Sequence, residues 1–179
     1  MPRIHWLGTG LSSIPGLRML LNKKYNVFVW NRTLEKAQSI LGDLTNNICK
    51  FDLNELENEI IAGDIIISML PASHHLDIAK LCLKKNANFI SSSYISEEIQ
   101  ELNSDVKKQG LVFLNEVGLD PGIDHLMAHD LVKQYKESYN YNDDNTIEFY
   151  SFCGGVPKKP NEFCYKFSWS PLGVLKALK

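Results

Sequence analysis

The stretch RIHWLGTGLSSIPG, residues 3–16, decides the fold that we predict for this chain of 179 residues. Its first five residues have the apolar character of a buried strand, and GTGLSSIPG then leads into a segment with helical character. Pro15 fits only the first turn of that helix, where a backbone N–H has no acceptor within the helix. A glycine-rich turn between a strand and a helix is the context in which a G-x-G pattern becomes informative.

Apolar runs of strand length recur along the chain, separated by segments with helical spacing. The predicted strands cover residues 3–7, 26–30, 47–51, 64–70, 88–93 and 110–114. Residues 65–67 are three consecutive isoleucines, so their strand is expected to be covered on both faces, as in a parallel sheet between helices. Helical spacing connects Leu34, Ala37 and Leu41, then Leu76, Ala79 and Leu83, then Ile95, Ile99, Leu102 and Val106. The prediction is an α/β fold with a Rossmann-type doubly wound parallel sheet.

The pattern changes after this alternation. We expect a dinucleotide-binding domain over residues 1–123 and a helix with a polar linker over 124–145. Residues 146–179 would be the incomplete beginning of a second, α+β domain, which opens with an aromatic strand at 146–155 (TIEFYSFCGG). Thr33 and Asp52 each precede a helical segment and are expected to be N-caps.

Composition narrows the class of partner. The net charge is −2 with no run of Lys or Arg, which argues against binding to nucleic acid or to an anionic membrane surface. No apolar stretch approaches the roughly 20 residues of a membrane span, and the N-terminus has no signal-peptide pattern. The four cysteines lack a C-x-x-C pair and are expected to be reduced. These features predict a cytoplasmic protein that acts on small molecules.

The glycine-rich turn predicts a dinucleotide site. Gly8 would permit the tight turn, and Gly10 would let the backbone approach a pyrophosphate at the helix N-terminus. Ser13 replaces the third glycine of the fingerprint, and it is small enough to preserve close packing of the helix on the strand. The alternative is an ordinary strand-to-helix turn.

The end of the second predicted strand indicates which dinucleotide is bound. An NAD site usually has an acidic residue there, whereas this chain has Asn31, Arg32 and Thr33. A neutral side chain does not repel a 2′-phosphate, and a guanidinium and a hydroxyl can bind it. NADP is therefore the predicted cofactor. The alternative is that Thr33 only caps a helix and Arg32 is a solvated charge.

Several motifs together resemble one enzyme family. They are GTGLSSIP, NRTLEKA, ISMLPASHH, SSSYIS, NEVGLDPGIDHLMA, SFCGG and YKFSWSPLGVL. These stretches resemble the saccharopine reductase group, the NADP-dependent, L-glutamate-forming saccharopine dehydrogenases of lysine metabolism. The resemblance implies a Rossmann domain followed by a larger substrate and dimerisation domain, and hence a homodimer.

The resemblance also implies the site residues. Thr9, Gly10, Leu11 and Ser12 would line the pyrophosphate, Asn31, Arg32 and Thr33 would bind the ribose phosphate, Asp52 and Leu70 would border the adenine, and Ser93, Tyr94, Leu119, Asp120 and Pro121 would approach the nicotinamide or the substrate. The implied reaction is reversible reductive amination, in which glutamate and aminoadipate semialdehyde form an imine that is reduced with NADPH. Asp120, Tyr94 and Cys153 are the candidates for proton transfer.

Each assignment has an alternative. The alternative for Asp120 is a purely structural role in the turn ahead of Pro-Gly, and the alternative for Tyr94 is stacking on a ring without a part in proton transfer. His125 and His129 have a spacing that zinc sites use, but no third ligand is evident, so no metal is predicted. Leu172 stands where related sequences often carry Arg, which leaves open an imine reductase for another amino acid or a polyamine. A module that binds NADP(H) without turnover is a further alternative.

Overall fold

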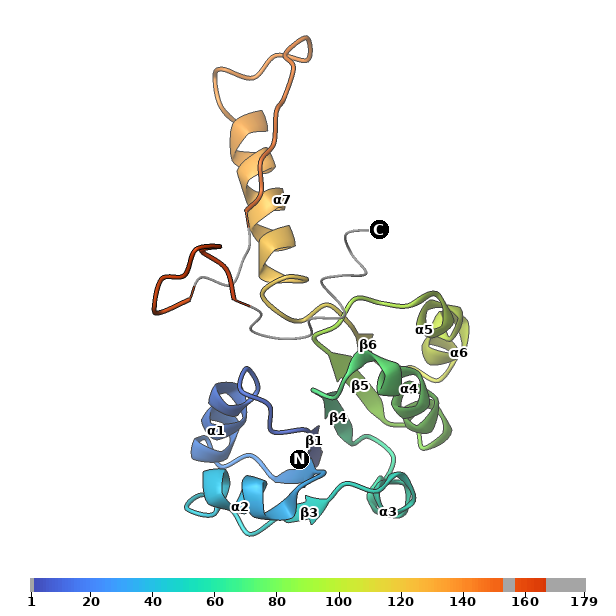
Figure 1. Ribbon diagram of the computed structural model, residues 1–179. Coiled ribbons are helices and arrows are strands. Elements are labelled where there is room, and N and C mark those ends of the chain that lie inside the picture. The colour runs from blue at the N-terminus through green and yellow to red at the C-terminus, as the bar shows by residue number, and fades with distance from the viewer. Residues whose placement is uncertain (1, 153–156, 167–179) are drawn as a thin grey trace. The chain divides into compact units, whose positions relative to one another are not determined.

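The computed structural model of the protein describes residues 2–152 and 157–166 and contains one six-stranded sheet (Figure 1). The strands are β1 (Ile4–Leu7), β2 (Val27–Asn31), β3 (Ile48–Lys50), β4 (Ile65–Ser68), β5 (Asn88–Ser91) and β6 (Phe113–Leu114). Neighbouring strands are all parallel, in the order β3-β2-β1-β4-β5-β6. All six predicted strands are present, which confirms the predicted doubly wound sheet.

The connections are helical. The helices are α1 (Ile14–Asn22), α2 (Leu34–Leu41), α3 (Leu53–Glu59), the 3-10 helix η1 (Ala72–His74), α4 (His75–Lys84), α5 (Glu97–Glu101), α6 (Asn103–Lys108) and α7 (Ile123–Lys136). Pro15 lies in the first turn of α1, as predicted. The single helix predicted around Ile95–Val106 is wrong, because it is interrupted at Leu102: α5 ends at Glu101 and α6 begins at Asn103. The Leu102 N–H donates to the Ile99 carbonyl three residues back, which tightens the last turn of α5.

Both faces of the sheet are buried, each in its own core. Ile4 and Trp6 of β1 pack with Leu17 and Leu21 of α1 and with residues of β2 and α2. Leu7, whose side chain lies on the other face, packs in a second core with residues of α3, α4, β5 and α5. In Figure 1, α1 and α2 accordingly lie on the opposite side of the sheet from α3 and α4. Coverage of both faces explains the run of isoleucines in β4, in which Ile66 joins one core while Ile65 and Ile67 pack against the other.

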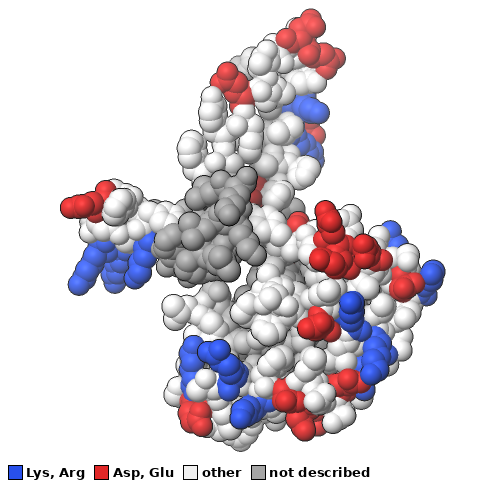
Figure 2. All heavy atoms as spheres, turned by 45° about the vertical axis from the view of Figure 1, so that its right-hand side comes forward, with Lys and Arg blue, Asp and Glu red and all other residues white. Residues whose placement is uncertain are grey.

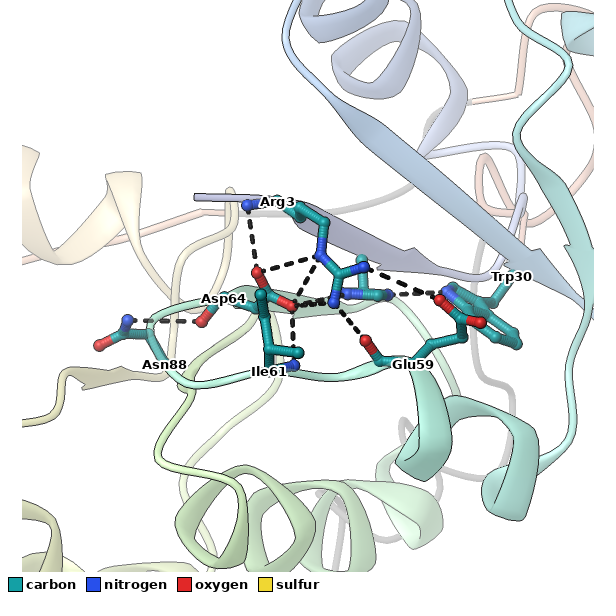
Figure 3. Close-up of polar contacts among 7 residues, drawn as sticks. Arg3, Trp30, Glu59, Ile61, Asp64 and Asn88 are labelled. Atoms are coloured by element: carbon teal, nitrogen blue, oxygen red, sulfur yellow. Dashed lines mark hydrogen bonds and ion pairs between the residues drawn. The ribbon is translucent and has the colours of Figure 1, made fainter. Parts of the chain in front are cut away.

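A buried carboxylate joins the amino-terminal ends of β1 and β4 (Figure 3). The side chain of Asp64 accepts hydrogen bonds from Arg3 Nη2 at 2.8 Å, from Ile61 N at 3.0 Å and from His5 Nε2 at 3.1 Å. Burial alone would raise the pKa of Asp64, but these hydrogen bonds together lower it below its ordinary value. The Trp30 indole can only donate, and it donates to His5 Nδ1 at 3.1 Å, so the proton of His5 is on Nε2. A ring that accepts at Nδ1 and carries its proton on Nε2 is neutral, and burial lowers the pKa of His5 in the same sense.

The surface carries charges of both signs. In Figure 2, Lys and Arg side chains lie among Asp and Glu side chains over the visible face of the sheet domain, with no continuous basic surface there. This mixture is consistent with the prediction that the partners are small molecules. Within the described residues, none of the helices has the length and apolar character required to cross a membrane.

The chain divides into two compact units, Met1–Met127 and Ala128–Lys179. Within the described part of the second unit, residues 146–152 form no strand and their backbone pairs with no other described backbone segment. The predicted strand at 146–155 is thus wrong over 146–152, because an aromatic segment becomes a strand only where a neighbouring strand satisfies its backbone. Residues 153–155 lie outside the described residues.

Candidate functional site

The carboxyl ends of three adjacent strands are in register at one edge of the sheet. Leu7 of β1 pairs with Ser68 of β4, and Ser68 pairs with Ser91 of β5. The loops that follow these strands therefore emerge together. The strand order reverses between β1 and β4, and in open α/β sheets ligands bind at such a switch point, outside the carboxyl ends of the strands.

The turn after β1 requires glycine at its first position. Gly8 has a φ of +97°, and its N–H donates to the Trp30 carbonyl at 2.8 Å. A Cβ at Gly8 would lie 3.0 Å from the Met69 carbonyl oxygen, so a side chain would meet backbone. Beside Gly10, in contrast, no atom lies within 4 Å of the position that a Cβ would occupy. The turn is closely packed at Gly8 and open at Gly10.

The turn also presents unused hydrogen-bond donors. Within the described residues, the backbone N–H groups of Gly10, Leu11 and Ser12 have no acceptor, and all three residues are exposed. Ser13 fixes the turn from inside, because its hydroxyl donates to the Gly10 carbonyl at 2.9 Å and lies 3.2 Å from the Gly8 carbonyl. Three free amides at the start of α1 form a site suited to an anionic group such as a pyrophosphate.

Asn31 ties this turn to the loop after β2. Its Oδ1 accepts from the Thr9 N–H at 3.1 Å, and its Nδ2 donates to the Thr33 carbonyl at 2.7 Å. Both polar atoms of this buried side chain are thereby used within the protein. The neighbouring Thr9 hydroxyl is buried and has no hydrogen-bond partner in the described part of the chain. A buried hydroxyl without a partner is unfavourable, so a ligand that satisfied it would gain binding energy.

Arg32 and Thr33 carry the exposed polar groups of the same loop. The Arg32 guanidinium makes no hydrogen bond or ion pair with any other described residue. Thr33 occupies the N-cap position of α2, but its hydroxyl does not accept from the helix amides. The predicted N-cap position of Thr33 is confirmed, but its side chain makes no capping hydrogen bond, and Asn31 holds the loop instead. A guanidinium and a hydroxyl remain free to bind a phosphate.

Two further predicted cofactor residues lie at the same edge of the sheet. Asp52 follows β3 and caps α3, as predicted, since its Oδ1 accepts from Asn54 N at 2.9 Å and from Glu55 N at 3.2 Å. Leu70 follows β4 and is half-buried, and its Cδ2 lies 3.5 Å from the position of a Cβ on Gly8. Leu70 thus covers the glycine turn, while the carboxylate of Asp52 stabilises a helix.

The stretch NEVGLDPGIDH folds back on the residues that follow β5. The backbone N–H of Glu116 donates to the Ser93 carbonyl at 3.1 Å, and that of Val117 donates to the Ser91 carbonyl at 3.1 Å. A Cβ at Gly122, which has a φ of +146°, would overlap the Gly118 carbonyl, so the turn between them requires glycine. Within this turn, Leu119 and Asp120 are exposed and Pro121 is buried.

Tyr94 and Asp120 meet where this turn contacts the segment after β5, and Ser93, Tyr94 and Asp120 are together called the rim. The Tyr94 hydroxyl donates to Asp120 Oδ1 at 2.7 Å, and this bond, with a smaller effect of burial, raises the pKa of Tyr94 to about 12. Asp120 makes no hydrogen bond to the backbone of its own turn in the described chain. Asp124 does so instead, since its Oδ1 accepts from Gly122 N at 2.8 Å. Asp124 itself lies within α7, which begins one residue earlier, at Ile123.

A buried histidine behind this rim was not predicted as a site residue. His75 Nδ1 lies 3.0 Å from Ser68 Oγ, and His75 Nε2 lies 2.9 Å from Ser93 Oγ. Burial, with a smaller effect of His74, lowers the pKa of His75 to about 4. The sequence did carry a signal that His75 is buried, because Ile78, Ala79 and Cys82 follow it at the spacing of one buried helix face.

The remaining candidate, Cys153, lies outside the described residues, as does Leu172. The structure thus brings together the glycine turn, Asn31–Thr33 and Leu70 around the switch point, and Ser93, Tyr94 and Asp120 at the adjacent rim.

Comparison with known proteins identifies the family of the chain. Residues 4–114 match the family model of the saccharopine dehydrogenase NADP binding domain, and residues 118–179 match that of the saccharopine dehydrogenase C-terminal domain. The chain is 34% identical to the saccharopine dehydrogenase (NADP(+), L-glutamate-forming) of Schizosaccharomyces pombe, over 100% of this chain and 41% of that protein. It is 35% identical to the mitochondrial alpha-aminoadipic semialdehyde synthase of Mus musculus, over 87% of this chain and 15% of that protein.

A solved structure shows the same fold. The apo saccharopine dehydrogenase (L-Glu forming) of Saccharomyces cerevisiae matches with a TM-score of 0.74 and 27% identity, over 99% of this chain and 41% of that one. The chain spans about two fifths of the length of these fungal relatives. The predicted type of domain, an NADP-binding Rossmann domain, is confirmed by the family match over residues 4–114. This chain belongs to the saccharopine dehydrogenase family.

Proposed function

We propose that this chain carries the NADP site and one rim of the substrate cleft of an L-glutamate-forming saccharopine dehydrogenase. The reaction would be the reversible reductive amination that joins glutamate to aminoadipate semialdehyde. Membership of the family supports the reaction type, and the free polar groups around the switch point support the cofactor. The activity of the complete enzyme is a proposal, because the chain spans about two fifths of its relatives.

One observation carries the cofactor assignment. The glycine turn and the Arg32–Thr33 loop are fixed to each other through Asn31, and each presents donors that no other described residue uses. The amides of Gly10, Leu11 and Ser12 would hold the pyrophosphate, and Arg32 with Thr33 would hold the 2′-phosphate. The orphaned Thr9 hydroxyl lies beside these donors and fits a site that is completed by an oxygen-rich ligand.

The chemistry would take place at the rim formed by Tyr94 and Asp120. Bound NADPH would supply the hydride that reduces the imine carbon. Asp120 Oδ1 is occupied by the Tyr94 hydroxyl, whereas Oδ2 has no partner among the described residues. Oδ2 would therefore accept a proton from the glutamate ammonium, which frees the amine to attack the aldehyde carbon, and would return it to the hydroxyl that leaves as water when the imine forms. Tyr94 would hold the carboxylate in position and keep its own proton at neutral pH.

The complete protein would be a cytoplasmic homodimer, with glutamate and aminoadipate semialdehyde as its substrates. An imine reductase for another amino acid or a polyamine differs only in its substrates. A substrate panel assayed on the complete protein separates the two candidates.

The experiment has a binding arm and a turnover arm. Fluorescence titration should show tighter binding of NADPH than of NADH, and NADPH oxidation by the complete protein should require both glutamate and the semialdehyde. Equal affinity for the two dinucleotides would overturn the cofactor assignment. NADPH binding without oxidation on any substrate of the panel would overturn the proposed reaction and favour a binding module.

A further inference from the structure

Three side chains form a hydrogen-bonded series behind the Tyr94–Asp120 pair. It runs from Ser68 at the end of β4, through His75 at the start of α4, to Ser93 after β5, with distances of 3.0 Å and 2.9 Å. Ser68 and His75 are buried, whereas Ser93 is half-buried. The series of hydrogen bonds thus leads from the interior of the sheet domain to a half-buried residue next to Tyr94.

Hydrogen-bond satisfaction fixes the direction of this series. Within the described residues, the only partner of the buried Ser68 hydroxyl is His75 Nδ1. A buried hydroxyl proton needs an acceptor, so Ser68 donates and Nδ1 accepts. His75 has one proton when it is neutral, and this proton is then on Nε2. His75 therefore donates to Ser93 Oγ.

The direction of these hydrogen bonds leaves the Ser93 hydroxyl proton free to donate. Because Ser93 Oγ accepts from His75, its own proton is not used in that bond and is available to another acceptor. The backbone of Ser93 is also held, since its N–H donates to Ser91 Oγ at 3.1 Å and its carbonyl accepts from Glu116 N. The hydroxyl proton is the group of Ser93 that remains for a ligand.

We infer that His75 is a positioning residue that fixes the Ser93 hydroxyl as a hydrogen-bond donor to a carbonyl-type oxygen of a bound ligand. Two sources offer this oxygen: the carboxamide of the nicotinamide cofactor and a carboxylate of the amino-acid substrate. The inference rests on the proposed function for the identity of both ligands. The direction of the Ser68–His75–Ser93 hydrogen bonds, called the relay below, follows from the protein's own groups and does not depend on the ligand.

Two substitutions of His75 test the relay as a matched pair. The amide nitrogen of Gln can replace the Nε2 donor, so His75→Gln should keep the bond to Ser93, whereas the shorter His75→Asn can reach only Ser68. Ser93→Ala removes the donor itself. If the cofactor is the acceptor, Ser93→Ala and His75→Asn should each weaken NADPH binding about 10-fold, and His75→Gln should stay within about threefold of the wild type.

If the substrate carboxylate is the acceptor, NADPH affinity should not change and the KM for glutamate should rise about 10-fold in the same two variants. In either case the Ser93→Ala/His75→Asn double variant should lose no more than Ser93→Ala alone, because His75 acts through Ser93. Additive losses would show that His75 acts independently and would overturn the inference. Unchanged NADPH affinity together with an unchanged KM in Ser93→Ala would also overturn it.

A spectroscopic measurement on the wild type does not depend on folding of the variants. Nitrogen-15 NMR of the His75 ring should show a neutral imidazole with its proton on Nε2. A proton on Nδ1 would overturn the relay. Failure of the wild type to bind NADPH would instead count against the proposed function, so the two failures are distinguishable.

Discussion

The Tyr94 hydroxyl donates a 2.7 Å hydrogen bond to Asp120 Oδ1 across 26 residues of sequence. This bond connects the segment after β5 to the turn that precedes α7. It leaves one carboxylate oxygen of Asp120 for another partner and raises the pKa of Tyr94 to about 12. The pair therefore consists of a carboxylate that can accept a proton and a phenol that keeps its proton at neutral pH.

Asp120→Asn should lower turnover without changing the affinity for NADPH. The amide preserves the size of the side chain but cannot take up a proton, and loss of a general acid–base group typically costs about 100-fold or more. Steady-state NADPH oxidation by the complete protein and a fluorescence titration measure the two quantities. Asp130→Asn, at an exposed position of α7, is the control and should have no effect. Wild-type turnover in Asp120→Asn at all pH values would leave Asp120 with no role in proton transfer.

Arg32→Ala should weaken NADPH binding about 10-fold or more and leave NADH binding nearly unchanged. A charge-assisted hydrogen bond contributes about 1.5 to 3 kcal/mol, and only NADPH has the 2′-phosphate that would accept it. Lys36→Ala, an exposed cation in α2, controls for general electrostatic attraction. Equal losses for the two dinucleotides in a fluorescence titration would remove Arg32 from the phosphate site.

The stability of the protein should fall as the pH falls from about 6.5 towards 4. The folded state holds the pKa of His75 at about 4, below its ordinary value of 6.5, so the unfolded chain binds more protons in this window. The free energy of unfolding that is lost amounts to about 3 kcal/mol for this group. Urea titrations at several pH values measure it.

His75→Gln should make this pH dependence shallower. Some dependence should remain, because burial also lowers the pKa of His5. The same slope in His75→Gln and in the wild type would show that His75 does not titrate in this window.

Asp64→Asn should destabilise the fold by about 3 kcal/mol, because it removes the charge that pairs with Arg3 while the guanidinium stays partly buried. Asp43→Asn is the matched control, since it breaks the exposed ion pair with Arg18 and should have little effect on stability. Thermal or chemical denaturation measures both. A small effect of Asp64→Asn would mean that the network in Figure 3 adds little to the stability of the sheet.

The sequence predicted the sheet because each strand carries its own local signal. The isoleucines of β4 and the glycine turn after β1 indicate burial and turn geometry without reference to the rest of the chain. The internal role of Asn31 was not predictable in this way, because its partners Thr9 and Thr33 lie on two different loops. The Ser68–His75–Ser93 relay likewise depends on the register of β4 with β5, a contact between distant segments.

An alanine substitution should reduce stability at Gly8, whereas at Gly10 it should reduce only NADPH binding. Gly8 has a positive φ, and a Cβ there would lie 3.0 Å from the Met69 carbonyl, so Gly8→Ala should destabilise the fold by about 1 to 3 kcal/mol and weaken NADPH binding as well. At Gly10 a Cβ has open space and the backbone needs no positive φ, so Gly10→Ala should fold with wild-type stability. The methyl group would instead occupy the space through which a pyrophosphate approaches the free amides of the turn. Denaturation and NADPH titration of both variants provide the test, and unchanged NADPH affinity in a folded Gly10→Ala variant would contradict a pyrophosphate site at this turn.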